Sequence, residues 1–119
     1  MVGIGPGNLE HLSVKAVEVL KGSDCIIGYK TYINLIKELV EGKEVISSGM
    51  RAEIERASLA IEKAESGNVV SVISSGDPGV YGMTGLILEV ARNGKHKVNV
   101  EVIPGISSEN AAAALLGAP

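Results

Sequence analysis

The feature that most constrains the fold is a regular alternation between short aliphatic segments and segments with helical periodicity. The aliphatic segments are predicted strands, at residues 1–4, 24–28, 45–48, 69–74 and 98–102. Apolar residues at helical spacing predict helices at residues 9–20, 33–40, 51–66, 83–91 and 108–116. A strand–helix unit repeated five times indicates an α/β fold with a mainly parallel sheet, because parallel strands need helical crossovers.

The composition favours a sheet that is covered on both faces. The chain has 119 residues, the size of one domain, and it contains no Phe, no Trp and only three Tyr. Its core must therefore consist of Val, Ile, Leu and Ala, the mixture typical of parallel strands between two helical layers. Residues 69–74 are almost continuously apolar, which predicts an interior strand, whereas residues 98–102 alternate and predict a half-exposed edge strand. We therefore expect a three-layer α/β/α domain.

Charge and cysteine content argue against several classes of protein. The formal net charge is −3, which argues against nucleic acid as the main partner. No apolar run reaches the length of a membrane span, and no signal segment opens the chain. The single cysteine, Cys25, lies in an apolar run and is predicted to be buried, and no Cys/His cluster has metal-ligand spacing. These features predict a cytoplasmic protein without a metal site.

Most of the remaining charged residues are predicted to lie on the surface. The two histidines, His11 and His96, fall on a polar helix face and in a turn. Six charged residues of the helix at 51–66 are predicted to form its solvated face: Arg51, Glu53, Glu55, Arg56, Glu62 and Lys63.

The predicted strand ends are the candidate ligand site. In an open parallel sheet, ligands bind outside the carboxyl ends of the strands. The loops that follow the predicted strands are rich in Gly and Pro, at residues 5–7, 28–30, 48–50, 75–79 and 104–108. One of them carries Asp77, whose carboxylate can accept hydrogen bonds from a ribose or amino group of a ligand, or instead from its own turn. The sequence leaves both roles open.

The first loop does not match a dinucleotide fingerprint. In a G-x-G-x-x-G frame that starts at Gly3, the sixth position is Asn8, and Pro6 interrupts the helix start. The second predicted strand ends in G-Y-K rather than in the acidic residue expected to hold a ribose. A nicotinamide cofactor is therefore not expected, and no Walker loop or Ser-His-Asp arrangement is present.

Three motifs follow one another along the chain: V-G-I-G-P-G-N at the start, with L-S-V-K-A after it, S-S-G-D-P-G-V-Y-G at 74–82 and V-I-P-G-I-S-S at 102–108. In this order they resemble the tetrapyrrole methylases, which use S-adenosylmethionine in corrin and sirohaem synthesis. Two further segments, G-Y-K-T-Y at 28–32 and E-V-I-S-S-G-M at 44–50, resemble the branch that methylates carbon 17 of precorrin-3B or cobalt-factor III. The resemblance covers essentially the whole chain.

The resemblance implies a fold, an activity and a domain organisation. The family's first domain has five parallel strands in the order 3-2-4-1-5, and residues 1–119 would be this domain, with the second domain missing from the chain. The methyl donor, S-adenosylmethionine, would lie between the two domains. The implied reaction is carbon-17 methylation of a precorrin with ring contraction in cobalamin biosynthesis. A homodimer is also expected.

The resemblance also assigns residues, although none is identified as catalytic. The donor would be held by Pro6, Ser75, Gly76, Asp77, Val80, Tyr81, Ser107 and Ser108. The tetrapyrrole substrate would lie against Tyr29, Lys30 and Tyr32, where Lys30 could pair with a substrate carboxylate. Two alternatives remain open: another tetrapyrrole methylase or a diphthine synthase, and a non-catalytic module that binds a ligand or serves in assembly.

Overall fold

The computed structural model describes residues 1–94 and 97–118, so the predicted surface position of His96 lies outside the described residues. Its centre is a sheet of four parallel strands in the order β1-β4-β2-β3. The strands are β1 (Val2–Gly3), β2 (Cys25–Tyr29), β3 (Glu44–Ser48) and β4 (Val70–Ser74). The predicted order of these four strands is therefore confirmed, and β4, which is buried over four of its five residues, lies in the interior as expected.

The prediction of a fifth strand at residues 98–102 is wrong. The segment does run beside β1, but in the described residues it forms a single parallel bridge, between Val2 and Ile103. Gly3 N donates to Ile103 O at 2.9 Å, and Ile103 N donates to Met1 O at 2.8 Å. The physical reason lies in β1, which is only two residues long because Gly5 turns the chain with φ at 70° and Pro6 has no N–H to donate.

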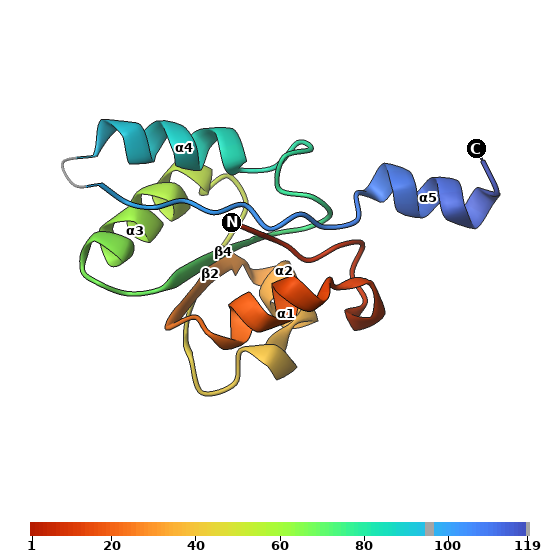
Figure 1. Ribbon diagram of the computed structural model, residues 1–119, viewed down its shortest axis with the longest axis horizontal. Helices are drawn as coiled ribbons and strands as arrows, with labels where there is room; N and C mark the ends of the chain where they lie inside the picture. Colours follow the sequence, from red (N-terminus) through yellow and green to blue (C-terminus); the bar gives the residue numbers. More distant parts are fainter. Residues whose placement is uncertain (95–96, 119) are drawn as a thin grey trace.

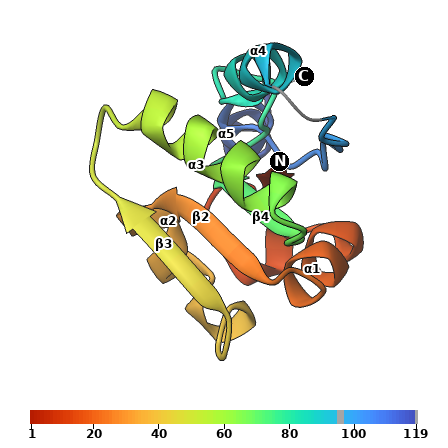
Figure 2. The ribbon, with the colours of Figure 1, turned by 90° about the vertical axis from the view of Figure 1, so that its left-hand side faces the viewer.

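Two layers of helix cover the sheet (Figures 1 and 2). Side chains alternate along each strand, so neighbouring residues enter different cores. Ile26 packs in the core beneath α1 (Val14–Lys21) and α2 (Lys30–Leu35). Ile27 packs in the core beneath α3 (Glu53–Glu65) and α4 (Thr84–Asn93). The predicted α/β/α layering is confirmed.

Two of the predicted helices are split. The pattern over residues 9–20 becomes a 3₁₀ turn, η1 (Leu9–His11), followed by α1. The helix restarts at Ser13, whose Oγ accepts a hydrogen bond from Ala16 N at 3.0 Å and so caps the new N-terminus. The pattern over residues 33–40 likewise divides into α2 and a second 3₁₀ turn, η2 (Lys37–Leu39). His11 is exposed, as predicted.

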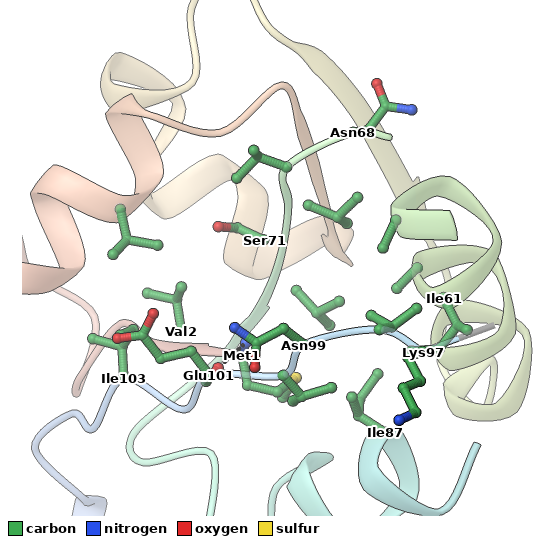
Figure 3. Close-up of a pocket in the computed structure, with 18 residues that line it drawn as sticks. Met1, Val2, Ile61, Asn68, Ser71, Ile87, Lys97, Asn99, Glu101 and Ile103 are labelled. Carbon is green, nitrogen blue, oxygen red and sulfur yellow. Dashed lines mark hydrogen bonds between the residues drawn. The ribbon is translucent and has the colours of Figure 1, made fainter. Parts of the chain in front are cut away.

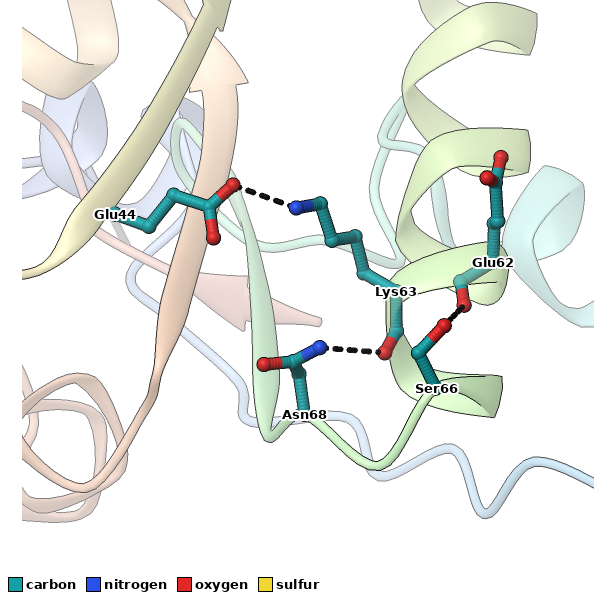
Figure 4. Close-up of polar contacts among 5 residues, drawn as sticks. All are labelled: Glu44, Glu62, Lys63, Ser66 and Asn68. Carbon is teal, nitrogen blue, oxygen red and sulfur yellow. Dashed lines mark hydrogen bonds and ion pairs between the residues drawn. The ribbon is translucent and has the colours of Figure 1, made fainter.

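Helix α3 carries most of its charged side chains toward solvent, and the exception is Arg56. Lys63 Nζ pairs with Glu44 Oε1 of β3 at 2.6 Å (Figure 4), and this hydrogen bond raises the pKa of Lys63. Arg51, Glu53, Glu55 and Glu62 are exposed, whereas Arg56 is buried at 8% exposure. The prediction that Arg56 lies on the solvated face is therefore wrong, for a reason given with the site below.

Cys25 is fully buried at the start of β2, as predicted. Burial raises the pKa of its thiol, and the nearby Glu44 carboxylate raises it further. The thiol is therefore held neutral in the core, where it packs as a small apolar side chain.

The last helix, α5 (Ser108–Leu116), stands apart from the layers and projects away from the sheet (Figure 1). Its bounds agree with the prediction. Leu115 and Leu116 near its end are 89% and 82% exposed, so an apolar part of α5 faces open space. Among the helices of the described residues, none is long and apolar enough to cross a membrane.

Candidate functional site

A cavity of about 680 Å³ opens at the carboxyl ends of the strands, where the sequence places its Gly- and Pro-rich loops. Two of these loops are joined by a reciprocal pair of backbone hydrogen bonds. Gly5 N donates to Gly76 O at 3.1 Å, and Gly76 N donates to Gly5 O at 2.8 Å. Both glycines have left-handed backbones, with φ at 70° and 61°, which other L-residues rarely adopt. The loops after β1 and β4 therefore form one rigid rim.

Asp77 joins a third loop to this rim. Its Oδ1 accepts a hydrogen bond from Gly105 N at 3.0 Å, and its Oδ2 accepts one from Gly79 N at 2.9 Å. Of the two roles left open by the sequence, the structure thus shows backbone capping, and it extends that role to a loop 28 residues away. Each carboxylate oxygen has a second lone pair, so this capping leaves Asp77 able to accept a hydrogen bond from a ligand.

The structure gathers all the residues that the sequence assigned to the methyl donor. All eight of them line this one cavity: Pro6, Ser75, Gly76, Asp77, Val80, Tyr81, Ser107 and Ser108. Ser107 is buried, and its Oγ accepts a hydrogen bond from Asn110 N at 3.3 Å, which caps the start of α5. The N-terminus of α5 therefore opens onto the cavity, together with the strand ends.

The residues assigned to the substrate are only partly gathered. Tyr29 and Tyr32 line the cavity and contact each other edge to face, with ring centroids 5.2 Å apart and planes at 83°. Lys30 is not part of the lining, and its side chain is exposed. Lys30 is the first residue of α2 and comes directly after Tyr29, the last residue of β2. The change from strand to helix at this point separates Lys30 from the part of the cavity wall that Tyr29 and Tyr32 form.

Sequence reasoning missed two charged residues of the cavity wall, Arg56 and Glu53, of which Arg56 is the buried one. Its Nη1 donates hydrogen bonds to Ser48 Oγ at 2.8 Å and to Gly49 O at 3.1 Å, at the end of β3. These bonds draw the side chain from the first turn of α3 over the sheet, which is why Arg56 is buried. The available signal was its position next to the buried Ala57 and four residues before the buried Ala60.

Other lining residues were also missed. Most are apolar or small and come from α2, the start of α4 and α5: Leu35, Met83, Ala111, Ala112 and Leu115. The sequence signal for these residues is weak, because an aliphatic residue at helical spacing is more often part of the hydrophobic core than of a ligand site. Glu53, from α3, also lines the cavity.

A second cavity, of about 350 Å³, lies at the other ends of the strands (Figure 3). It is enclosed by the start of β4, helix α3 and the segment 97–103, and it exists because that segment does not complete a ladder. Ser71 points into it, but Ser71 Oγ already shares a 2.6 Å hydrogen bond with Ser23 Oγ. Two motif residues, Val2 and Ile103, line it, but none of the residues assigned to the donor or to the substrate does. Within residues 1–94 and 97–118, no three His, Cys, Asp or Glu side chains gather as a metal site would require.

Comparison with known proteins agrees with the motifs. The family model of the tetrapyrrole (corrin/porphyrin) methylases matches residues 1–119. The cobalt-factor III methyltransferase of Priestia megaterium is 52% identical over the whole chain, which covers 23% of that protein. The probable cobalt-factor III C(17)-methyltransferase of Salmonella typhimurium is 48% identical over the whole chain, which covers 49% of that protein. The chain thus spans half or less of the length of these relatives.

Solved structures show the same fold. The methyltransferase CobJ superimposes with a TM-score of 0.91 at 34% identity, over 99% of this chain and 50% of that one. A diphthine synthase superimposes with a TM-score of 0.75 at 29% identity, over 98% of this chain and 47% of that one. With a family match over its full length and a cavity built from that family's motifs, this chain belongs to the tetrapyrrole methylases.

Proposed function

We propose that this chain contributes the donor-binding strand ends of an S-adenosylmethionine-dependent methyltransferase that acts on carbon 17 of a tetrapyrrole in cobalamin biosynthesis. The observation that carries the proposal is the convergence of eight motif residues, distant in sequence, on one cavity at the strand ends. The substrate class comes from the relatives, two of which are named for cobalt-factor III at 52% and 48% identity. A diphthine synthase is a more distant match, at 29% identity.

The residues of the cavity suit the donor. A volume of about 680 Å³ lies within the usual range of small-molecule sites, roughly 300 to 1,000 Å³. The rim provides polar groups on Ser75, Asp77 and Ser108, which suit the donor's amino acid and ribose portions, beside the apolar surfaces of Val80 and Tyr81. We propose these as the donor contacts. S-adenosylmethionine supplies a methyl group that is already activated by its sulfonium.

The chain therefore needs mainly to align two reactants and to exclude water. Tyr29 and Tyr32 offer aromatic surface in the cavity wall to a flat macrocycle. The rigid rim of Gly5, Gly76 and Gly105 holds the donor side in place, because three loops are cross-bonded there. The pairing of Lys30, which is exposed outside the cavity lining, with a substrate carboxylate stays a prediction.

We further propose that residues 1–119 act as the first of two domains. The relatives extend well beyond the matched segment, and α5 ends in two exposed apolar residues, Leu115 and Leu116, the first of which lines the cavity. Burial of this surface against further polypeptide would close the site to water. A homodimer and a cytoplasmic location are likewise retained as proposals.

The test is an assay with the full product of the gene. S-adenosylmethionine labelled with ¹³C in its methyl group is incubated with cobalt-factor III, precorrin-3B and other corrin precursors, and the products are examined by NMR. We expect label at carbon 17 of one of the first two compounds. Label at another ring carbon would assign the protein to a different branch of the family, and donor binding without any transfer would favour a non-catalytic module.

A further inference from the structure

The guanidinium of Arg56 is a buried positive charge in the wall of the strand-end cavity. Its side chain is only 9% exposed, although a guanidinium is a cation with five N–H donors. A buried charge is costly unless it is paired or fully hydrogen-bonded. The hydrogen-bond and ion-pair partners of Arg56 therefore show whether groups of the protein offset the cost of burying this charge.

The protein satisfies only part of this charge. Within the described residues, both side-chain hydrogen bonds of Arg56 leave from Nη1, to Ser48 Oγ and to Gly49 O, and both acceptors are uncharged. The nearest carboxylate is Glu53, whose Oε1 forms an ion pair with Nη2 at 3.8 Å, which is too long for a hydrogen bond, and the Glu53 side chain is 51% exposed. A guanidinium has five N–H donors, so most of the donors of Arg56 are not used by these contacts.

The unused donors are not sealed inside the protein. No side-chain nitrogen or oxygen in the described residues is both buried and without a hydrogen-bond partner. The nitrogens of Arg56 that have no hydrogen-bond partner therefore keep some accessible surface, and Arg56 is a lining residue of the strand-end cavity. A ligand in this cavity can thus meet a guanidinium that is shielded from bulk water and already held in place through Nη1.

The position of Arg56 relates it to the substrate side of the cavity. Ser48, to which Nη1 donates, is paired in register with Tyr29 on the neighbouring strand. Adjacent strands lie about 4.8 Å apart, so the guanidinium is anchored one strand away from the tyrosine pair. The donor motifs, in contrast, come from the ends of β1 and β4 and from the start of α5.

We propose that Arg56 binds a carboxylate side chain of the tetrapyrrole and so sets the substrate's orientation in the cavity. This inference rests on the proposed function, because it takes its ligand from that reaction. A carboxylate is the anion that matches a guanidinium fork in shape and charge. Arg56 fits this role better than Lys30 does, since Lys30 is exposed and lies outside the cavity lining.

Steady-state kinetics of the full gene product test this role with three variants. In Arg56→Gln, the tetrapyrrole KM is expected to rise about 10- to 100-fold, the loss typical of a hydrogen bond to a charged group. The donor KM and kcat are expected to change far less. Arg56→Lys keeps the positive charge but lacks the planar guanidinium, so its tetrapyrrole KM should lie between those of wild type and Arg56→Gln. Ser48→Ala removes the anchoring hydrogen bond but leaves the guanidinium, and its tetrapyrrole KM should stay within about threefold of wild type.

The outcomes separate binding from a structural role. If Ser48→Ala raises the tetrapyrrole KM as much as Arg56→Gln does, or if Arg56→Gln raises both KM values equally, Arg56 only holds the loop at residues 48–50 and the inference is wrong. Urea unfolding of each variant identifies effects of misfolding. If Arg56→Gln does not fold, the comparison of Arg56→Lys with wild type decides, and an unchanged tetrapyrrole KM in Arg56→Lys overturns the inference.

A binding titration distinguishes this inference from the proposed function. Uroporphyrin III, a tetrapyrrole with eight carboxylates, is titrated against wild type and Arg56→Gln by absorbance. If wild type transfers no methyl group to any tetrapyrrole, the proposed function fails, but weaker binding of uroporphyrin III to Arg56→Gln still supports the carboxylate site. Equal binding by the two proteins, or no binding by either, would overturn it.

Discussion

Replacement of Gly105 by alanine is expected to destabilise the protein by about 3 kcal/mol, the upper part of the range for overpacking. A Cβ at Gly105 would lie 2.3 Å from Gly76 O and 2.9 Å from Gly3 C, and both are backbone atoms that cannot swing aside. The change would separate the loops after β1 and β4 from the loop that Asp77 holds. Chemical denaturation of the wild type and the variant measures the effect.

Gly49→Ala is the matched control for this change. Gly49 also lies in a loop after a strand, but a Cβ there would meet no atom within 4 Å. Its effect is expected to stay within about 0.5 kcal/mol, as for most surface substitutions. Equal stability of the Gly105 and Gly49 variants would show that the three loops do not pack as closely as the structure indicates.

Asp77→Ala is expected to weaken binding of S-adenosylmethionine by at least about tenfold and to lower the stability by about 2 kcal/mol. The change leaves Gly105 N and Gly79 N without their acceptor, and hydrogen bonds to charged groups contribute roughly 1.5 to 3 kcal/mol each when shielded from water. We place the total near the lower end, because Asp77 is partly exposed. Calorimetric titration with the donor and urea unfolding measure the two effects.

Asp24 provides a control with the same chemistry at the other end of the sheet. Its Oδ2 accepts a hydrogen bond from the backbone N–H of Val69 at 2.7 Å, just before β4 begins. Asp24→Ala should therefore lower the stability by about 1 kcal/mol, the usual contribution of one hydrogen bond, and leave donor affinity unchanged. If Asp24→Ala weakens donor binding as much as Asp77→Ala does, the effect comes from general destabilisation and Asp77 has no special place in the site.

The interior of the fold could be predicted because its pattern is local. Residues 69–74 and 24–28 are aliphatic runs between turn signals, and the structure places both in the centre of the sheet. The fifth strand could not be predicted correctly, because the alternation at residues 98–102 is a local signal whereas a ladder needs a partner. That partner, β1, is cut short after Gly3 by the turn that also builds the site.

The site was predicted as a set of loops rather than as a set of contacts. Strand ends meet at one edge by topology, so Pro6, Asp77 and Ser107 could be grouped without knowledge of any distance. The burial of Arg56 could not be predicted, because it depends on two hydrogen-bond acceptors at the end of β3 that only the folded chain brings close to the guanidinium. A charged residue in the first turn of an amphipathic helix ordinarily faces water, and this one does not.

The most direct test of the central claim is a crystal structure of the full gene product with S-adenosylhomocysteine, the demethylated form of the donor. We predict that the ligand lies in the strand-end cavity and contacts the loop at residues 75–77 and the start of α5 at Ser107 and Ser108. A ligand bound instead in the cavity between α3 and the segment 97–103, or away from the strand ends altogether, would contradict the account.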